Sequence, residues 1–255
     1  MERRYERNGI VITPEENKAL AARKVCVAGC GGLGGGVIEG LVRSGVGNVV
    51  AVDGDVFDET NLNRQVLSNE SNLGRSKARE AVRQMKEINS QVEVTAVEAF
   101  IDESNAEEII AGADVVVDAL DSVGARRILE GACEKQGIPM VHGAIAGWNG
   151  QVAVVMPGDR LMGELYSGEE DRGAEVSTGN PYFTPAAVSA IQVAETLKLL
   201  TGRESVLRNR LLMMDLLHHQ YELIDFGEDY ENSDDKRVFQ DRQDDYGDSA
   251  DGGAA

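Results

Sequence analysis

The chain has 255 residues, 42% of them hydrophobic, which is enough to bury a large core and fits one domain with a small appendage. Its formal net charge of -19 argues against nucleic-acid phosphates or an anionic membrane surface as main partners. No segment approaches the roughly 20 apolar residues of a membrane span, and the charged start lacks the apolar core of a signal peptide, so we expect a cytoplasmic location.

The first half of the chain alternates apolar segments with helical patterns. Thr13, Pro14 and Glu16 form a capping pattern that predicts a helix from Pro14 to near Ala22. Apolar strands are then expected at 24–29, 48–53, 92–97, 114–120 and 139–145, and helices at 33–44, 77–89, 103–111 and 126–136. This alternation predicts a parallel sheet that is covered by helices on both faces.

The pattern changes after Gly150. A strand is expected at 151–157, a long helix at 184–201 and two more strands at 211–217 and 220–226, while the polar, Gly-rich stretch 156–185 is too long for a simple connector. The expected fold class is therefore α/β, a Rossmann-like, mostly parallel sheet with helices on both faces, extended by antiparallel strands. We expect residues 1–226 to form one domain and the acidic residues 227–255 to form a disordered tail.

A glycine-rich turn, "GCGGLGG", follows the first predicted strand. It places Gly29, Gly31 and Gly34 in a G-x-G-x-x-G pattern at the start of a helix. Glycines let the backbone approach phosphates, and a helix N-terminus supplies N–H groups and positive partial charge. Asp53, at the end of the second strand, suits ribose hydroxyls. These features predict a nucleotide site, but they fit NAD enzymes and other nucleotide-binding folds alike.

Charged residues further along favour a triphosphate. The run "NLNRQ" places Arg64 just past the second strand, and Lys77 begins a later helix. Hydride transfer does not need these cations near the phosphates, whereas a leaving pyrophosphate develops charge that they would neutralise. "DALDS" places Asp118 and Asp121 at the end of a buried strand, where a carboxylate can bind Mg²⁺. Without a phosphate, Arg64 and Lys77 are ordinary surface charges and Asp118 caps a helix.

In this order the motifs resemble the ThiF/MoeB/HesA family, relatives of ubiquitin-activating enzymes. The matching segments are "RYERN", "GCGGLGG", "SGVGNVVAVDGDVFDETNLNRQ", "GRSKA", "DALDS" and "GWNGQVAVVMPG", and the resemblance covers roughly residues 4–225. It is nearest to bacterial molybdopterin-synthase and sulfur-carrier adenylyltransferases, and it makes residues 1–226 an ATP-binding adenylation domain. The resemblance implies that the Gly-Gly carboxylate of a ubiquitin-like sulfur carrier attacks the α-phosphate of ATP, giving an acyl-adenylate and pyrophosphate.

The resemblance also implies residue roles. Arg64 and Lys77 contact the phosphates, Asp121 binds Mg²⁺, and Ser122 stands where relatives often have Asn. Arg7 matches a residue that reaches the ATP of the partner subunit, which implies a homodimer, and the implied catalytic set is Arg7, Arg64, Lys77 and Asp121. The full implied nucleotide site is Gly29, Gly31, Gly32, Gly34, Asp53, Asn61, Arg64, Lys77, Asp121 and Ser122.

The cysteines depart from the family pattern. Two C-x-x-C pairs that bind zinc in many bacterial members are absent, so we expect no zinc. The crossover cysteine that some members use for thioester or persulfide chemistry is also absent, and the nearest residue, Ser177, is expected to be structural. Cys26, Cys30 and Cys133 are expected in a strand, the glycine turn and a helix, and none is a good replacement. The chemistry is expected to end at the adenylate, with sulfur delivered by another protein.

Three alternatives remain open. A nicotinamide-dependent oxidoreductase would use the glycine turn and Asp53 but leaves Arg64, Lys77 and Asp121 unexplained. A non-catalytic or accessory partner protein would explain the missing cysteines but not the intact ATP residues. Adenylation of another acceptor, such as a tRNA base or a peptide carboxylate, is a third. The carrier, and whether it serves thiamine, a molybdenum or tungsten cofactor, or sulfur amino acids, is not specified by the sequence.

The three histidines are not assigned to the chemistry. His142 closes a buried strand and is interpreted as a core histidine with satisfied hydrogen bonds. His218 and His219 fall at an expected hairpin turn, and we assign them no function.

Overall fold

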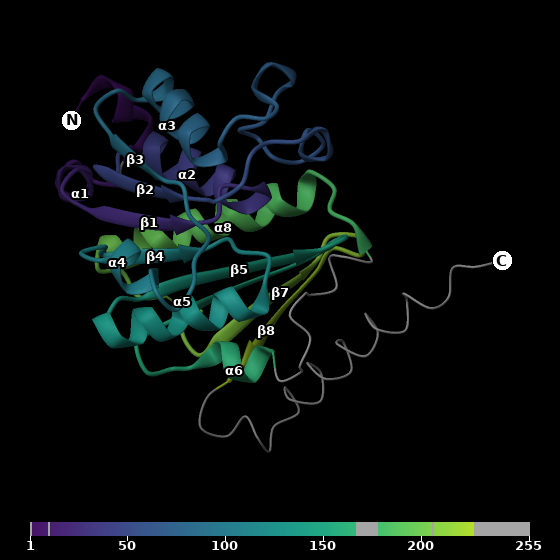
Figure 1. Ribbon diagram of the computed structural model, residues 1–255. Helices are drawn as coiled ribbons and strands as arrows, with labels where there is room; N and C mark the ends of the chain where they lie inside the picture. Colours follow the sequence, from purple (N-terminus) through teal and green to yellow (C-terminus); the bar gives the residue numbers. More distant parts are fainter. Residues whose placement is uncertain (1, 10, 167–177, 206, 227–255) are drawn as a thin grey trace.

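The computed structural model describes residues 2–9, 11–166, 178–205 and 207–226; Ser177 and the expected tail, 227–255, lie outside the described residues. The described residues form an eight-stranded sheet with the order β3-β2-β1-β4-β5-β6-β7-β8 (Figure 1). The strands are β1 (Lys24–Ala28), β2 (Asn48–Val52), β3 (Glu93–Val97), β4 (Val115–Asp118), β5 (Met140–Ala146), β6 (Asn149–Val155), β7 (Arg210–Asp215) and β8 (Gln220–Asp225).

The pairing of the strands confirms the predicted mixed sheet. Strands β1 to β5 pair with one another in parallel, and β6, β7 and β8 continue the sheet from β5 through antiparallel pairs. Ala28 at the end of β1 pairs with Val52 on one side and with Asp118 on the other. The strand order reverses between β1 and β4, and open α/β sheets bind their ligands at the carboxyl ends of the strands at such a point.

Helices cover both faces of the sheet (Figure 1). Helices α2, α3 and α8 pack on one face, and α4, α5 and α6 pack on the other. The helices are α1 (Pro14–Leu20), α2 (Gly32–Ser44), α3 (Lys77–Ile88), α4 (Ala106–Ile110), α5 (Val123–Gln136), α6 (Leu161–Leu165) and α8 (Phe183–Leu200), with short 3-10 helices η1 (Arg3–Asn8), η2 (Glu59–Asn61) and η3 (Glu70–Asn72). The helices of the described residues are all too short or too polar to cross a bilayer.

Two apolar clusters hold the layers together. Val25 and Val27 of β1 point into the cluster beneath α2, and the alternating residues Cys26 and Ala28 point into the cluster beneath α5. All four are fully buried. Burial of a side chain the size of valine stabilises the fold by about 1.5–3 kcal/mol, so β1 is fixed from both faces.

Local polar contacts explain where helices begin. The predicted capping box of α1 is present, because Thr13 Oγ1 accepts from Glu16 N–H at 3.2 Å and Glu16 Oε2 accepts from Thr13 N–H at 2.7 Å. Helix α5 begins at Val123 rather than at the predicted Arg126, because Ser122 caps it.

Helix α4 is shorter than the predicted 103–111. The Asp102 side chain accepts from Ser104 N–H at 2.8 Å, which forms a turn before the helix begins at Ala106. Helix α6 lies in the Gly-rich stretch for which no helix was predicted.

Candidate nucleotide-binding site

The turn between β1 and α2 contains two kinds of glycine. Gly29 has φ of +98°, and a Cβ there would lie 2.5 Å from the Ala119 carbonyl oxygen. A Cβ on Gly34 would lie 1.8 Å from the Gly29 carbonyl oxygen, so backbone packing requires glycine at both positions. A Cβ on Gly31 or Gly32 would meet no atom closer than 3.5 Å. Gly31 and Gly32 therefore offer the part of the turn that a phosphate can approach.

Asp53 lies beside this turn, as its place at the end of β2 predicts. Its Oδ2 accepts from Cys30 N–H at 2.8 Å, and its Oδ1 accepts from Asp55 N–H at 2.8 Å. Burial raises the pKa of Asp53, although these two hydrogen bonds and the charge of Lys77 oppose the rise. Each carboxylate oxygen keeps lone pairs beyond the one used here, and these can accept from ribose hydroxyls.

Lys77 is a buried cation with an exposed partner. It begins α3, and its Nζ lies 3.3 Å from Asp55 Oδ2. The Lys77 side chain is 9% exposed, whereas that of Asp55 is 59% exposed. A buried ammonium needs an anionic partner, and one solvent-exposed carboxylate leaves room for a phosphate to serve as another.

The loop after β2 places Arg64 at the turn. Arg64 Nη1 donates to Asn63 Oδ1 at 2.9 Å, and its Cγ lies 3.8 Å from where a Cβ on Gly32 would be. Asn61 is buried, and its Oδ1 accepts from Asp58 N–H at 3.1 Å, which caps η2. The structure thus brings Arg64 to the glycine turn and gives Asn61 a local structural bond; their contacts with a nucleotide stay predictions.

Gln65 has a buried oxygen without a partner. Its side chain lies beside the turn, with Nε2 3.5 Å from where a Cβ on Gly31 would be. Gln65 is 6% exposed, and within the described part of the chain no group is hydrogen bonded to its Oε1. Such a group costs about 1–3 kcal/mol unless a ligand or water satisfies it. The sequence motif contained Gln65, but nothing in the local pattern indicated its burial.

Asp121 lies three residues past the end of β4 and is exposed. The start of this turn touches the glycine turn, because Ala119 N–H donates to Ala28 O at 2.9 Å and Gly29 packs against Ala119. A single carboxylate suits Mg²⁺ that is held mainly by nucleotide phosphates. The described residues contain no cluster of three or more His, Cys, Asp or Glu side chains that could hold a metal without a nucleotide.

Ser122 and Asp118 both bond to backbone N–H groups in the segment after β4. Ser122 Oγ accepts from Ala125 N–H at 3.1 Å and so caps α5, and its contact with a nucleotide stays a prediction. The helix-cap interpretation of Asp118 is wrong. Its Oδ1 accepts from Leu120 N–H at 3.0 Å, which caps the turn, and its Oδ2 accepts from His142 Nδ1 at 2.7 Å.

His142 is confirmed as a hydrogen-bonded core histidine. Burial lowers its pKa and outweighs the opposing effect of Asp118. The cysteines have the predicted positions, and all three are buried free thiols. Burial raises the pKa of Cys26 and of Cys133 to about 12. His218 lies in the hairpin turn between β7 and β8, where Asp215 accepts from its ring.

Arg7 lies at the opposite end of the sheet from the glycine turn. Its helix η1 is fixed by Tyr5, whose hydroxyl accepts from Asn89 Nδ2 at 2.8 Å and whose ring packs on Gly45. Asn89 and Gly45 are the C-terminal caps of α3 and α2. Gly32 begins the 13-residue helix α2, which is about 20 Å long, so η1 lies roughly that far from the turn. The structure does not bring Arg7 to the site of its own chain.

Phe100 is an exposed aromatic residue that the sequence reasoning missed. It follows β3, is 68% exposed, and lies over Gly54, where a Cβ would be 2.6 Å from its ring. Gly54 directly follows Asp53, so Phe100 offers an apolar face next to the carboxylate expected at the ribose. The pattern that could have identified Phe100 is a single aromatic residue just past the predicted strand 92–97.

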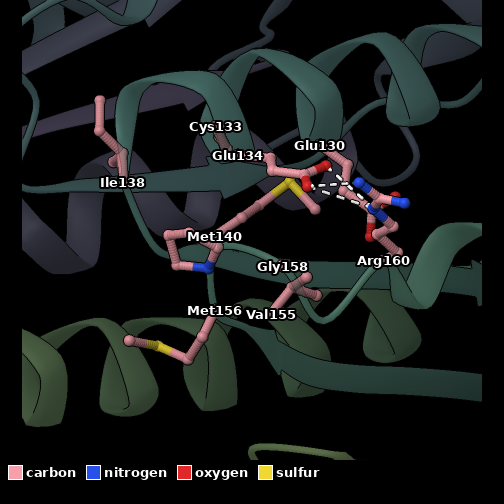
Figure 2. A pocket seen from close by; sticks show the side chains of 10 residues that line it. Glu130, Cys133, Glu134, Ile138, Met140, Val155, Met156, Gly158 and Arg160 are labelled. Atoms are coloured by element: carbon pink, nitrogen blue, oxygen red, sulfur yellow. Dashed lines mark hydrogen bonds and ion pairs between the residues drawn. The ribbon is translucent and has the colours of Figure 1, made fainter.

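A cavity elsewhere in the molecule is too small to be the nucleotide site. It measures about 10 Å³ and lies between α5 and strands β5 and β6, with Cys133, Met140 and Val155 among its lining residues (Figure 2). This volume holds at most one water molecule. Glu130 at its rim already accepts from Met162 N–H at 2.9 Å.

Comparisons with known proteins agree with this architecture. The SAMP-activating enzyme E1 of Haloferax volcanii is 37% identical over 228 residues, which cover 88% of this chain and 84% of that protein. The sulfur carrier protein adenylyltransferase of Thermus thermophilus is 36% identical over 230 residues, covering 86% and 84%. The crystal structure of E. coli MccB shares the fold, with a TM-score of 0.77 at 21% identity, covering 89% of this chain and 72% of that one. The sequence profile of the ThiF family matches residues 5–234, and the chain therefore belongs to the ThiF family.

Proposed function

We propose that this protein uses ATP to adenylylate the C-terminal glycine of a ubiquitin-like sulfur carrier that ends in Gly-Gly. One observation carries the proposal: the approachable backbone at Gly31 and Gly32 has Arg64 beside it, and Gly29 in the same glycine run packs against the turn that leads to Asp121. The charge of Lys77 acts on Cys30 and Asp53 next to this backbone. The names of the relatives, a SAMP-activating enzyme and a sulfur carrier protein adenylyltransferase, support the acceptor class.

The proposed reaction needs charge neutralisation more than covalent help. The glycine carboxylate attacks the α-phosphorus, the bond to the bridging oxygen breaks, and pyrophosphate leaves with the electron pair. Arg64 and Lys77 neutralise the phosphates, and the uncapped N-terminus of α2 adds N–H donors. Asp53 accepts from the ribose hydroxyls, and Phe100 offers its face to the base. Asp121 is the proposed ligand of Mg²⁺, which would neutralise phosphate oxygens when bound.

The burial of all three thiols supports a reaction of this chain that ends with the acyl-adenylate. Nucleophilic sulfur is the thiolate, and burial raises the pKa of Cys26, Cys30 and Cys133 far from the neutral range. We therefore propose that sulfur comes from another protein. The chain has three cysteines and no C-x-x-C pair, so we also propose that it holds no structural zinc, which elemental analysis checks.

We further propose a homodimer in which Arg7 reaches the site of the partner subunit. The attachment of η1 to the C-terminal ends of α2 and α3 supports this arrangement, because Arg7 lies roughly 20 Å from the turn of its own chain. The side chain is exposed and available to a neighbouring subunit.

The test of the reaction is ATP–pyrophosphate exchange. We expect exchange that requires both Mg²⁺ and a carrier ending in Gly-Gly, and no exchange with a carrier shortened by these two residues. Tight binding of NADH without binding of ATP would instead support a nicotinamide-dependent oxidoreductase. Binding of ATP and carrier without exchange would support a non-catalytic partner protein.

The test of the dimer is complementation between two inactive variants. A mixed dimer of Arg7→Ala and Lys77→Ala chains has one site with both residues intact if Arg7 acts in the partner's site. Equal mixing should restore activity at roughly one site in four. If Arg7 acts within its own chain, every site lacks one residue, and mixed dimers that are shown to form stay inactive.

A further inference from the structure

A hydrogen-bond network of buried and half-buried side chains lies behind Asp121, and we call it the Tyr166 network: Asp118, Arg126, His142, Gln151 and Tyr166. It joins β4, β5, β6 and α5 to Tyr166, the residue directly after α6. Arg126 Nη1 donates to Tyr166 Oη at 2.7 Å, and Gln151 Nε2 donates to the same oxygen at 2.9 Å. Arg126 Nε lies 3.7 Å from Asp118 Oδ2, so the buried charges balance.

One arrangement of protons satisfies these contacts. Neutral His142 donates from Nδ1 to Asp118, which leaves its Nε2 as an acceptor. That Nε2 lies 3.3 Å from Tyr166 Oη and 3.1 Å from Gln151 Nε2. Because Tyr166 Oη already accepts two hydrogen bonds, its own proton is directed toward His142. Tyr166 therefore completes hydrogen bonds of three other side chains.

The network controls the peptide group that precedes Asp121. Leu120 N–H donates to Asp118 Oδ1 at 3.0 Å, and the Leu120 carbonyl oxygen accepts from Arg126 Nη2 at 2.6 Å. This carbonyl belongs to the peptide bond between Leu120 and Asp121. The guanidinium thus holds that peptide with one nitrogen and the phenol of Tyr166 with another, so a change at Tyr166 alters the hold on Asp121.

We propose that Tyr166 is a positioning residue for Asp121 and acts through Arg126 and the peptide bond between Leu120 and Asp121. The inference rests on the proposed role of Asp121 in holding Mg²⁺. A functional carboxylate must stay within about 0.5 Å of its productive position, and buried hydrogen bonds behind a ligand supply that restraint. Loss of such an outer partner commonly lowers metal affinity or activity about 10–100-fold.

The test is Tyr166→Phe, which removes the hydroxyl and keeps the ring that packs 5.3 Å from the Arg126 guanidinium. ATP binding is measured by calorimetry with and without Mg²⁺. We expect the gain in ATP affinity that Mg²⁺ produces to fall about tenfold, with little change in the affinity for metal-free ATP. Tyr221→Phe is the matched control, since Tyr221 is exposed on β8, and it should match the wild type in both conditions.

A double-mutant cycle separates positioning from stability. In an Asp121→Asn background, Tyr166→Phe should have no further effect on the Mg²⁺ dependence, because the residue that it positions is already lost. Arg126→Lys keeps the charge but cannot hold both partners, so it should reproduce the loss and serves if Tyr166→Phe folds poorly.

Three results would overturn the inference. One is a lower melting temperature for Tyr166→Phe with an unchanged Mg²⁺ dependence. Another is an equal loss of ATP affinity with and without Mg²⁺. The third is an unchanged Mg²⁺ dependence in Asp121→Asn itself, which would also contradict the metal role in the proposed function, whereas the first two leave that role intact.

Discussion

The two turns that meet where the strand order reverses are built in opposite ways. The turn between β1 and α2 leaves the backbone of Gly31 and Gly32 approachable and the Oε1 of Gln65 without a partner. The turn between β4 and α5 is instead held by hydrogen bonds from buried side chains, among them Asp118 and Arg126. One edge of the sheet thus combines a surface that can receive an anion with a rigid support for one exposed carboxylate.

This contrast predicts opposite responses to substitution. A buried polar group without a protein partner opposes folding, so its loss is expected to reduce ligand binding and to leave stability equal or higher. Removal of a buried charge that is paired within the protein should instead lower stability, because it leaves the partner charge uncompensated. Asp121 is the exception in its own turn, since its carboxylate is exposed while the peptide before it is fixed.

The largest expected difference is between Asp121→Ala and Asp118→Ala, in both exchange rate and stability. Removal of one electrostatic element commonly lowers the rate about 10²–10³-fold, so Asp121→Ala should nearly abolish exchange at an unchanged melting temperature. Asp118→Ala leaves Arg126 without its buried counter-ion and His142 without its buried acceptor, and it should lower stability by about 3–5 kcal/mol while reducing exchange less. Exchange rates and urea unfolding of both variants measure this. Near-normal exchange by Asp121→Ala would contradict its assignment as the metal ligand.

Two glycines in the first turn of α2, Gly32 and Gly34, give the next contrast. A Cβ at position 34 would lie 1.8 Å from the Gly29 carbonyl oxygen, so Gly34→Ala should destabilise by at least about 3 kcal/mol. Gly32→Ala meets no such clash and should leave stability equal or up to about 1 kcal/mol higher, because alanine favours a helix. The same Cβ should weaken ATP binding about tenfold. Calorimetry and thermal melts test the pair, and equal destabilisation by the two changes would refute the distinction.

Two buried glutamines offer a smaller effect. Gln192 Nε2 donates to Asp118 O at 2.8 Å and to Val141 O at 3.3 Å, so Gln192→Met should destabilise by about 1–3 kcal/mol. Gln65→Met removes an oxygen whose unpaired burial costs about 1–3 kcal/mol, so it should leave stability equal or raise it by up to that amount, with ATP bound severalfold more weakly. Urea unfolding and ATP titration of both variants check this. An ATP affinity unchanged in Gln65→Met would exclude Gln65 from the site.

The sequence could predict those features of the fold and site that depend on residues close together in the chain. The apolar strands, the capping box at Thr13 and the place of Asp53 beside the glycine turn all follow from local patterns, and the structure confirms them. The Tyr166 network could not be predicted in this way, because Tyr166 meets Arg126 across 40 residues and lies in a polar stretch without periodicity. The start of α5 was misplaced for a related reason, since Ser122 suits both a nucleotide contact and a helix cap.

The smallest expected effect is on the pH dependence of stability, and it comes from His142, which bonds Asp118 at the start of the turn between β4 and α5. The pKa of His142 lies below its usual value of about 6.5 because burial opposes its charge, and nearby Arg126 opposes it further, while Asp118 favours it. Between the folded and unfolded pKa values the unfolded chain binds more protons, so stability falls as the pH drops below about 6.5, by at most about 1.4 kcal/mol per pH unit. His142→Asn can still donate to Asp118 but does not titrate, so its stability should fall less than that of the wild type.

Urea midpoints at pH 7.5, 6.5 and 5.5 measure the difference, and comparison with the wild type removes the contributions of other titrating groups. His218→Asn is the matched control, because His218 is exposed in the β7–β8 hairpin and faces Asp215. The wild type and His218→Asn should both lose stability more steeply than His142→Asn over this range. Parallel profiles for His142→Asn and the wild type would mean that the fold does not oppose the second, charging proton on His142. The neutral His142 assigned to the Tyr166 network would then be wrong.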